Sequence, residues 1–92
     1  GWLQSEYIHK PSISVDKNNE TVNLNWSTKN LSVVNKWVLY KRYGDIWEME
    51  ILKANKKSLD IITIKNGKKL NAVAIRAIDR LGNESEYDAK SI

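Results

Sequence analysis

Short runs of alternating apolar and polar residues fill most of the chain, and turn-forming residues separate them about every 8–12 positions. This spacing is typical of strands that each bury one face. It predicts an all-β, seven-stranded antiparallel sandwich. The expected strands are marked by Ile13 and Val15 after Pro11; Val22, Leu24 and Trp26; Lys36 to Tyr43; Trp47, Met49 and Ile51; Leu59, Ile61 and Ile64; Leu70 to Asp79; and Glu86 to Ile92.

The segment 46–55 is the one place where a helix competes with a strand, because glutamate and lysine recur there. Its alternation of period two, and the Gly44-Asp45 turn before it, favour the strand. In that strand we expect Glu48 and Glu50 on the solvent face and Trp47 at the end of the core. An exposed Trp47 is the alternative.

The length of 92 residues suits one domain with one core. We expect residues 1–10 to be a linker or leader from an upstream domain and residues 11–92 to be the sandwich. No apolar run approaches the roughly 18 residues of a membrane-spanning helix. The net charge of +4 comes partly from lysine pairs in predicted turns, which indicates solvated loops; an anion-binding face is the alternative. We expect no nucleic-acid partner.

Candidate catalytic and metal-binding residues are few. The chain has no cysteine, and its one histidine, His9, falls in the predicted linker. Asp79, Asn83 and Glu84 offer oxygen ligands for calcium, but the same residue types stabilise tight turns, which is the interpretation we favour. Glu48 and Glu50 are expected on a solvent face, which does not form a sugar cleft. We therefore predict no catalytic residue, no cofactor and no metal.

Three segments resemble the fibronectin type III family, in the order and at the spacing of that family. They are Val22-Asn23-Leu24-Asn25-Trp26, Trp37-Val38-Leu39-Tyr40-Lys41-Arg42, and the stretch from Ala74 to Ser85, which reads AIRAIDRLGNES. The resemblance covers about residues 11–92. It implies an immunoglobulin-like sandwich in which Trp26 and Trp37 lie in the core.

The chain departs from that family at the start of the sixth strand. The family usually has a tyrosine there, whose hydroxyl bonds to the preceding loop. Leu70 or Asn71 occupies this place, so we expect the loop at 66–69 to be held by other groups.

A further resemblance concerns the leader. The segment from Leu3 to Pro11, together with the turn from Asp79 to Ser85, is similar to the junction in bacterial glycoside-hydrolase-like proteins, where a TIM-type barrel is followed by a C-terminal fibronectin-like domain. This resemblance implies a secreted bacterial parent that is extracellular, periplasmic or at the cell surface. It also places any catalytic carboxylates in the barrel.

We therefore expect a non-catalytic accessory module, monomeric when isolated, that packs on or orients a neighbouring domain of the same parent chain. Two alternatives remain: a carbohydrate-binding module with exposed, coplanar rings at Tyr40, Tyr43 and Trp47, and an adhesion or receptor-type protein-binding domain. An apolar leader and outward-facing tyrosines suit an interface. The predicted interface residues are Trp2, Leu3, Tyr7, Ile8, Tyr40 and Tyr43; for the leader, folding back on its own domain is the alternative.

Overall fold

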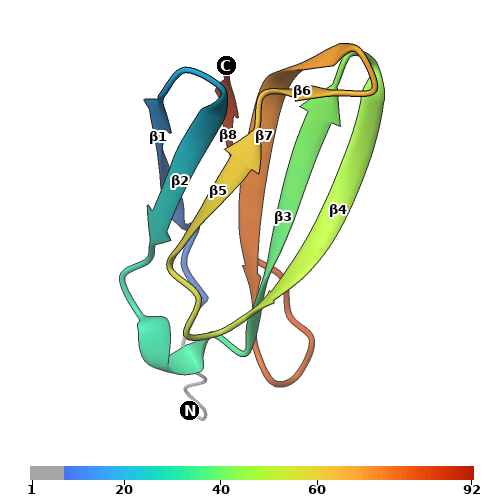
Figure 1. Cartoon of the computed structure of the whole chain (residues 1–92). Helices are drawn as coiled ribbons and strands as arrows, with labels where there is room; N and C mark the ends of the chain where they lie inside the picture. The colour runs from blue at the N-terminus through green and yellow to red at the C-terminus, as the bar shows by residue number, and fades with distance from the viewer. Residues whose placement is uncertain (1–7) are drawn as a thin grey trace, which may run out of the picture.

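Two antiparallel sheets pack face to face in the computed structural model, which describes residues 8–92 (Figure 1). The smaller sheet has the order β1-β2-β5. The larger sheet has the order β4-β3-β7-β6, with β8 also paired to β7. The elements are β1 (Ser12–Lys17), β2 (Thr21–Ser27), the 3-10 helix η1 (Leu31–Val33), β3 (Lys36–Tyr43), β4 (Ile46–Lys53), β5 (Ser58–Ile62), β6 (Ile64–Lys65), β7 (Lys68–Ile78) and β8 (Asp88–Ser91).

The all-β antiparallel class is confirmed, but the number of strands within residues 8–92 is eight rather than seven. The fifth predicted strand was wrong as a single element, because it divides at Thr63. The part before Thr63 pairs with β2, and the part after it pairs with β7 in the other sheet. At the crossing, the backbone N–H and the hydroxyl of Thr63 both donate to the carbonyl of Glu20, each at 3.1 Å.

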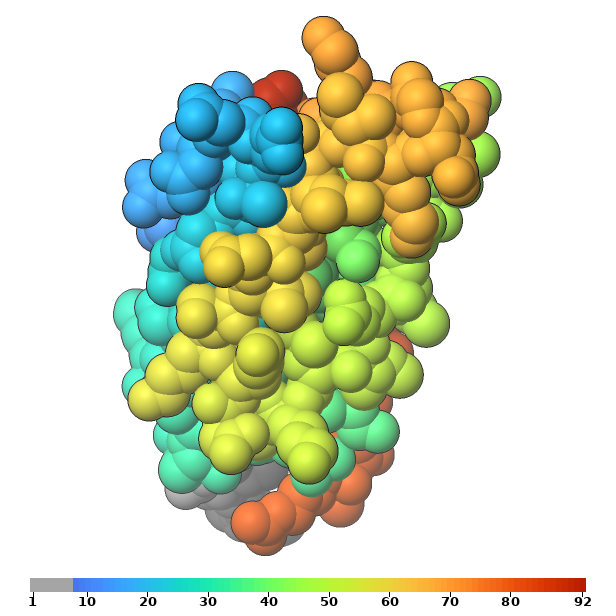
Figure 2. Space-filling view, in the orientation of Figure 1, coloured from blue at the N-terminus to red at the C-terminus, as the bar shows by residue number. Residues whose placement is uncertain are grey.

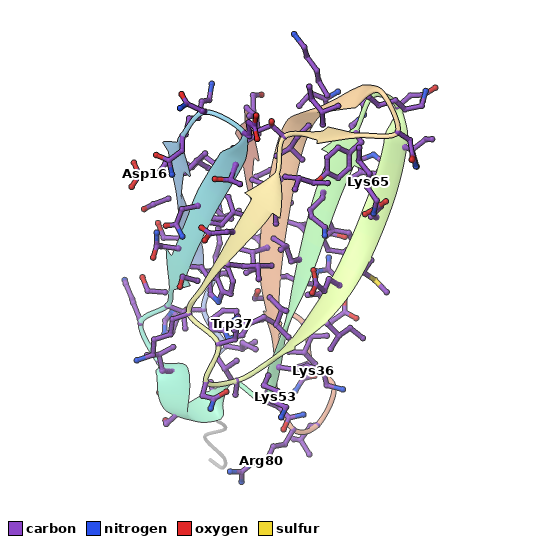
Figure 3. All side chains as sticks on the ribbon, viewed as in Figure 1. Asp16, Lys36, Trp37, Lys53, Lys65 and Arg80 are labelled. Carbon is purple, nitrogen blue, oxygen red and sulfur yellow. The ribbon has the colours of Figure 1, made fainter. Side chains whose placement is uncertain are left out.

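The core lies between the sheets and centres on two indole rings, as the sequence predicts. Trp37 is fully buried and Trp26 nearly so; their ring centroids are 6.4 Å apart in an edge-to-face arrangement. Figure 3 shows Trp37 between the two sheets. The indole N–H of Trp26 donates to the carbonyl of Lys56 and that of Trp37 to the carbonyl of Ala54. The two rings therefore hold the turn between β4 and β5 as well as filling the interior.

Segment 46–53 is a strand, not a helix, but its predicted faces were reversed. A two-residue turn, Gly44-Asp45, joins β3 to β4, and Gly44 has a φ of +64°, which suits the first central position of a tight hairpin turn. This turn places Ile46 directly opposite the buried Tyr43. Since alternate residues share a face, Glu48 and Glu50 then point toward the inner side of the sheet and Trp47 points outward.

Two of the predicted interface residues, Ile8 and Tyr43, are buried, and for Ile8 this agrees with the alternative that the leader folds back on its own domain. Ile8, predicted to contact a partner, is buried and belongs to the core cluster. Tyr43, predicted to face outward, is 4% exposed because its position on β3 lies on the inner face with Leu39. The domain division at residues 10 and 11 stays a prediction, and Trp2, Leu3 and Tyr7 lie outside the described residues.

Tyr43 supplies a tyrosine hydroxyl that Leu70 cannot supply, but it binds the segment at 62–63 rather than the loop at 66–69. The Tyr43 hydroxyl donates to the carbonyl of Ile62 at 2.8 Å, and the N–H of Leu70 donates to the carbonyl of Thr63 at 2.7 Å. A tyrosine from β3 therefore fixes the segment where the chain passes from β5 to β6.

Candidate docking surface

The larger sheet turns one face toward the core and the other face, here called the outer face, away from the smaller sheet. Residue pairing assigns the side chains to each face. Leu39 and Ile75 are opposite one another and fully buried in the core. Val38 and Tyr40, their neighbours on β3, therefore belong to the outer face.

Three large apolar side chains of β4 lie in a line on the outer face. Trp47, Met49 and Ile51, which we call the β4 stripe, are 53%, 60% and 59% exposed. Residues two apart in a strand are about 7 Å apart along it, so the stripe is continuous. Because β4 ends the larger sheet, the stripe runs along its free edge, which is at the right in Figure 1.

Aromatic rings and arginines continue the outer face beyond the β4 stripe. Tyr40 packs edge-to-face on Tyr87, with 5.2 Å between the ring centroids and 66° between the ring planes. The Arg76 guanidinium lies 3.9 Å from the centre of the Tyr87 ring and forms an ion pair with Glu84. Tyr40, Tyr87 and Arg76 are therefore held in place by contacts within the domain itself.

Arg42 and Trp47 are a cross-strand pair on the same face. They lie opposite one another in the β3–β4 register, and the guanidinium carbon of Arg42 is 5.9 Å from the Trp47 ring centre. Such a cation near an aromatic face is attracted by the quadrupole of the ring. One surface therefore combines tryptophan, tyrosine and arginine, the residue types most often dominant at protein interfaces.

A shallow charged groove lies on the inner side of β4, where the two sheets separate. It encloses about 280 Å³ and is lined by Lys41, Tyr43, Glu50, Leu59, Asp60, Ile61, Ile62 and Lys65. Figure 2 shows this side of the molecule, with side chains of β3 recessed behind those of β5 and β6.

The charges in and beside this groove neutralise one another. The Lys41 ammonium is 3.3 Å from the Glu50 carboxylate, and the Lys65 ammonium is 2.8 Å from that of Glu48. The hydrogen bond from Lys65 holds the pKa of Glu48 below its usual range and raises the pKa of Lys65. Glu48 is thus stabilised as a carboxylate, whereas the acid of a glycosidase needs a raised pKa to donate a proton.

The turn after β7 uses its polar residues for its own structure. One carboxylate oxygen of Asp79 accepts from the backbone N–H groups of Leu81 and Asn83, and the other accepts from the side-chain amide of Asn83. These hydrogen bonds, that from the Asn83 side chain foremost, lower the pKa of Asp79. Within residues 8–92, no group of three or more acidic, histidine or cysteine side chains is placed to hold a metal ion. The turn interpretation of Asp79 therefore accounts for its contacts.

Of the predicted interface residues within the described part of the chain, Tyr40 alone reaches the outer face, where it is half-buried against Tyr87. The sequence interpretation missed Arg42, Met49 and Ile51. Their signal was present in β3 and the Gly44-Asp45 turn together. Alternation from a core Trp37 places Tyr43 on the inner face, and pairing Tyr43 with Ile46 then assigns the β4 stripe to the outer side. No helix among residues 8–92 is long and apolar enough to cross a membrane.

Comparison with known proteins gives a structural likeness and no sequence relative. No family model matches the chain, and no curated protein matches it by sequence. It is similar to a part of the spore cortex lytic enzyme SleM from Clostridium perfringens, with a TM-score of 0.70 and 15% identity over 92% of this chain. It is also similar to a part of the pectate lyase PelI from Erwinia chrysanthemi, solved with tetragalacturonic acid, with a TM-score of 0.66 and 17% identity over 88% of this chain.

The chain spans 28% of the length of each of those two solved chains. At this identity the likeness shows the fold alone. The chain is thus a small β domain that resembles a part of carbohydrate-active enzymes, which is compatible with an accessory domain.

Proposed function

We propose that this chain is a non-catalytic accessory module of the fibronectin type III kind, and that it docks through its outer face onto a neighbouring domain of a larger secreted bacterial carbohydrate-active protein. The observation that carries the proposal is the β4 stripe. Isolated apolar side chains are normal on a protein surface, but a continuous set beside tyrosines and arginines is typical of an interaction site.

The arrangement of the sheets supports the fibronectin type III part of the proposal. A three-stranded sheet, β1-β2-β5, faces a larger sheet whose central strands are β3 and β7. Trp26 comes from the middle strand of the first and Trp37 from a central strand of the second. The three segments that resemble the family thus supply the centre of each sheet and the turn after β7.

The paired charges of the groove support a non-catalytic role. Catalysis by side chains requires a nucleophile with an activating base, or an acid and a base whose pKa values are separated. The hydrogen bond from Lys65 stabilises the ionised form of Glu48, Glu50 is ion-paired with Lys41, and the groove is shallow.

Exposed Trp47 also suits the alternative of a carbohydrate-binding module, since sugars stack on flat rings. The rings do not form the coplanar platform that this alternative predicted. Tyr43, one of the three rings that this alternative named, is buried, and Tyr40 is half-buried against Tyr87. Methionine and isoleucine in the β4 stripe favour a protein partner over a sugar.

The proposal is tested by calorimetric titration of this chain into the domain that adjoins it in the parent, expressed separately. We expect binding that Ile51→Ala weakens by about fivefold or more, as loss of an apolar contact does. Ile64→Ala is the matched control, because Ile64 is similarly exposed (55%) but belongs to β6; it should leave the affinity unchanged. Absence of binding, or equal effects of the two substitutions, would refute docking through the outer face.

A further inference from the structure

The outer face is strongly biased toward positive charge. Lys36, Arg42 and Lys53 occupy outer positions of β3 and β4, and Arg76 occupies one on β7 opposite Val38. Lys36 and Lys53 are paired across β3 and β4 and lie near one end of the sheet in Figure 3. Glutamates of β4 lie on the inner side instead. Among the described outer positions of β3, β4 and β7 there is thus no carboxylate.

The two arginines of the outer face differ in whether a carboxylate of residues 8–92 pairs with them. Both have an Nε atom that is buried without a hydrogen-bond partner in the described part of the chain. Arg76 nevertheless pairs with the carboxylate of Glu84, supplied by the loop after β7. No carboxylate of residues 8–92 lies within ion-pair distance of Arg42, whose guanidinium lies beside the Trp47 ring.

Resting on the proposed function, we propose that the docking partner is an acidic protein surface, in which one carboxylate pairs with Arg42 and apolar side chains around it cover the β4 stripe. The partner's carboxylate forms with Arg42 the kind of ion pair that Glu84 forms with Arg76. Trp47 lies beside the ion pair and shields it from water, and shielding strengthens a charge-assisted hydrogen bond.

The charge pattern selects against the other occupants. A second copy of this face would bring Arg42 and the lysines against like charges, which costs association. An acidic polysaccharide would satisfy Arg42, but Met49 and Ile51 offer a sugar ring no flat surface. An apolar surface with acidic groups satisfies both the cations and the stripe.

The proposed pairing of a carboxylate with Arg42 is tested with a small probe, 4-phenylbutyrate, which joins an apolar ring to one carboxylate. Its neutral counterpart is 4-phenylbutanol. Nuclear magnetic resonance titration of the full chain should show shifts at the backbone amide of Arg42 and the indole of Trp47 with the acid. Arg42→Gln should weaken this binding by about fivefold, the size of an exposed to half-buried ion pair. The alcohol should bind the wild-type chain about as weakly as the acid binds Arg42→Gln.

Lys36→Gln is the matched control, since it removes the same charge from the same strand and face about 20 Å away. It should leave the affinity for 4-phenylbutyrate within a factor of about two of wild type, as expected for a screened distant charge. Equal losses for Arg42→Gln and Lys36→Gln would overturn a specific role for Arg42. The amide spectrum of each variant shows directly that it is folded.

Two further results separate this inference from the proposed function. If the adjoining domain binds and Ile51→Ala weakens it, but Arg42→Gln has no effect on either that domain or the probe, docking stands and the acidic partner is wrong. If tetragalacturonic acid shifts the same resonances more strongly than 4-phenylbutyrate, and loses affinity in Arg42→Gln, the face recognises an acidic polysaccharide and the protein partner is wrong.

Discussion

Ser85 is a buried polar side chain that holds the loop carrying Tyr87 to the outer face. Its replacement by alanine should lower the free energy of unfolding by an amount that the structure indicates. Its hydroxyl oxygen accepts from the backbone N–H of Ala77 at 2.9 Å and the hydroxyl donates to the carbonyl of Glu86 at 2.9 Å. Ser85 is 5% exposed and Ala77 fully buried. The bond fixes the loop after β7, which delivers Tyr87 to Tyr40 and Arg76.

The magnitude follows from which group loses its partner. In Ser85→Ala, the N–H of Ala77 stays in a place that water does not reach, and an orphaned buried donor costs about 2 kcal/mol. The carbonyl of Glu86, an exposed residue, regains water at little cost. For a domain of this size the melting temperature should fall by about 10 °C.

Urea unfolding of wild type and Ser85→Ala, followed by tryptophan fluorescence, measures this loss. The midpoint should fall while the slope with urea stays constant, since the surface exposed on unfolding is unchanged. Ser91→Ala, on the exposed end of β8, is the control and should change stability by less than about 0.5 kcal/mol. A loss as small for Ser85→Ala would show that water reaches Ala77 and that the loop is open.

Three other outcomes are expected. Trp47→Ala should reduce the unfolding free energy by less than about 1 kcal/mol, because the ring lies half in water; a loss several times larger in urea unfolding would return Trp47 to the core. Tyr43→Phe should cost about 1 kcal/mol by removing the hydrogen bond to the Ile62 carbonyl, seen as a lower melting temperature; no change would contradict that bond. Because the pKa of Asp79 is lower folded than unfolded, its contribution is present above about pH 4 and is lost on further acidification. Asp79→Asn should flatten that part of the stability profile below pH 4, and an unchanged profile would contradict the lowered pKa.

Most of the architecture was accessible from the alternation of apolar residues. Val22, Leu24 and Trp26 alternate strictly and are buried as expected, and the strand at 46–53 was separated correctly from a helix. Alternation gives the period of a strand but not which of its faces is buried when both faces carry bulky groups. In β4 the buried face is set by the turn at Gly44-Asp45, because the turn pairs Ile46 with the buried Tyr43. This pairing overrides the preference of Trp47 for the interior.

The remaining differences come from contacts distant in sequence. Nothing near Thr63 marks a change of sheet; the carbonyl of Glu20, 43 positions away, makes the crossing favourable. Arg42 was missed for a related reason, since its significance depends on Trp47 across the hairpin and on a carboxylate that Arg76 has and Arg42 lacks.

The central claim of the proposed docking is that the β4 stripe is exposed in this domain and covered by the neighbouring domain in the parent. Met49 measures this directly, because it is the one methionine of the chain and lies in the middle of the β4 stripe. Its labelled methyl signal can be followed with a soluble paramagnetic probe, once in this chain and once in the parent chain, using Met49→Leu to assign the signal. The account predicts strong relaxation in the isolated chain and a several-fold weaker effect in the parent; equal relaxation in both would contradict it.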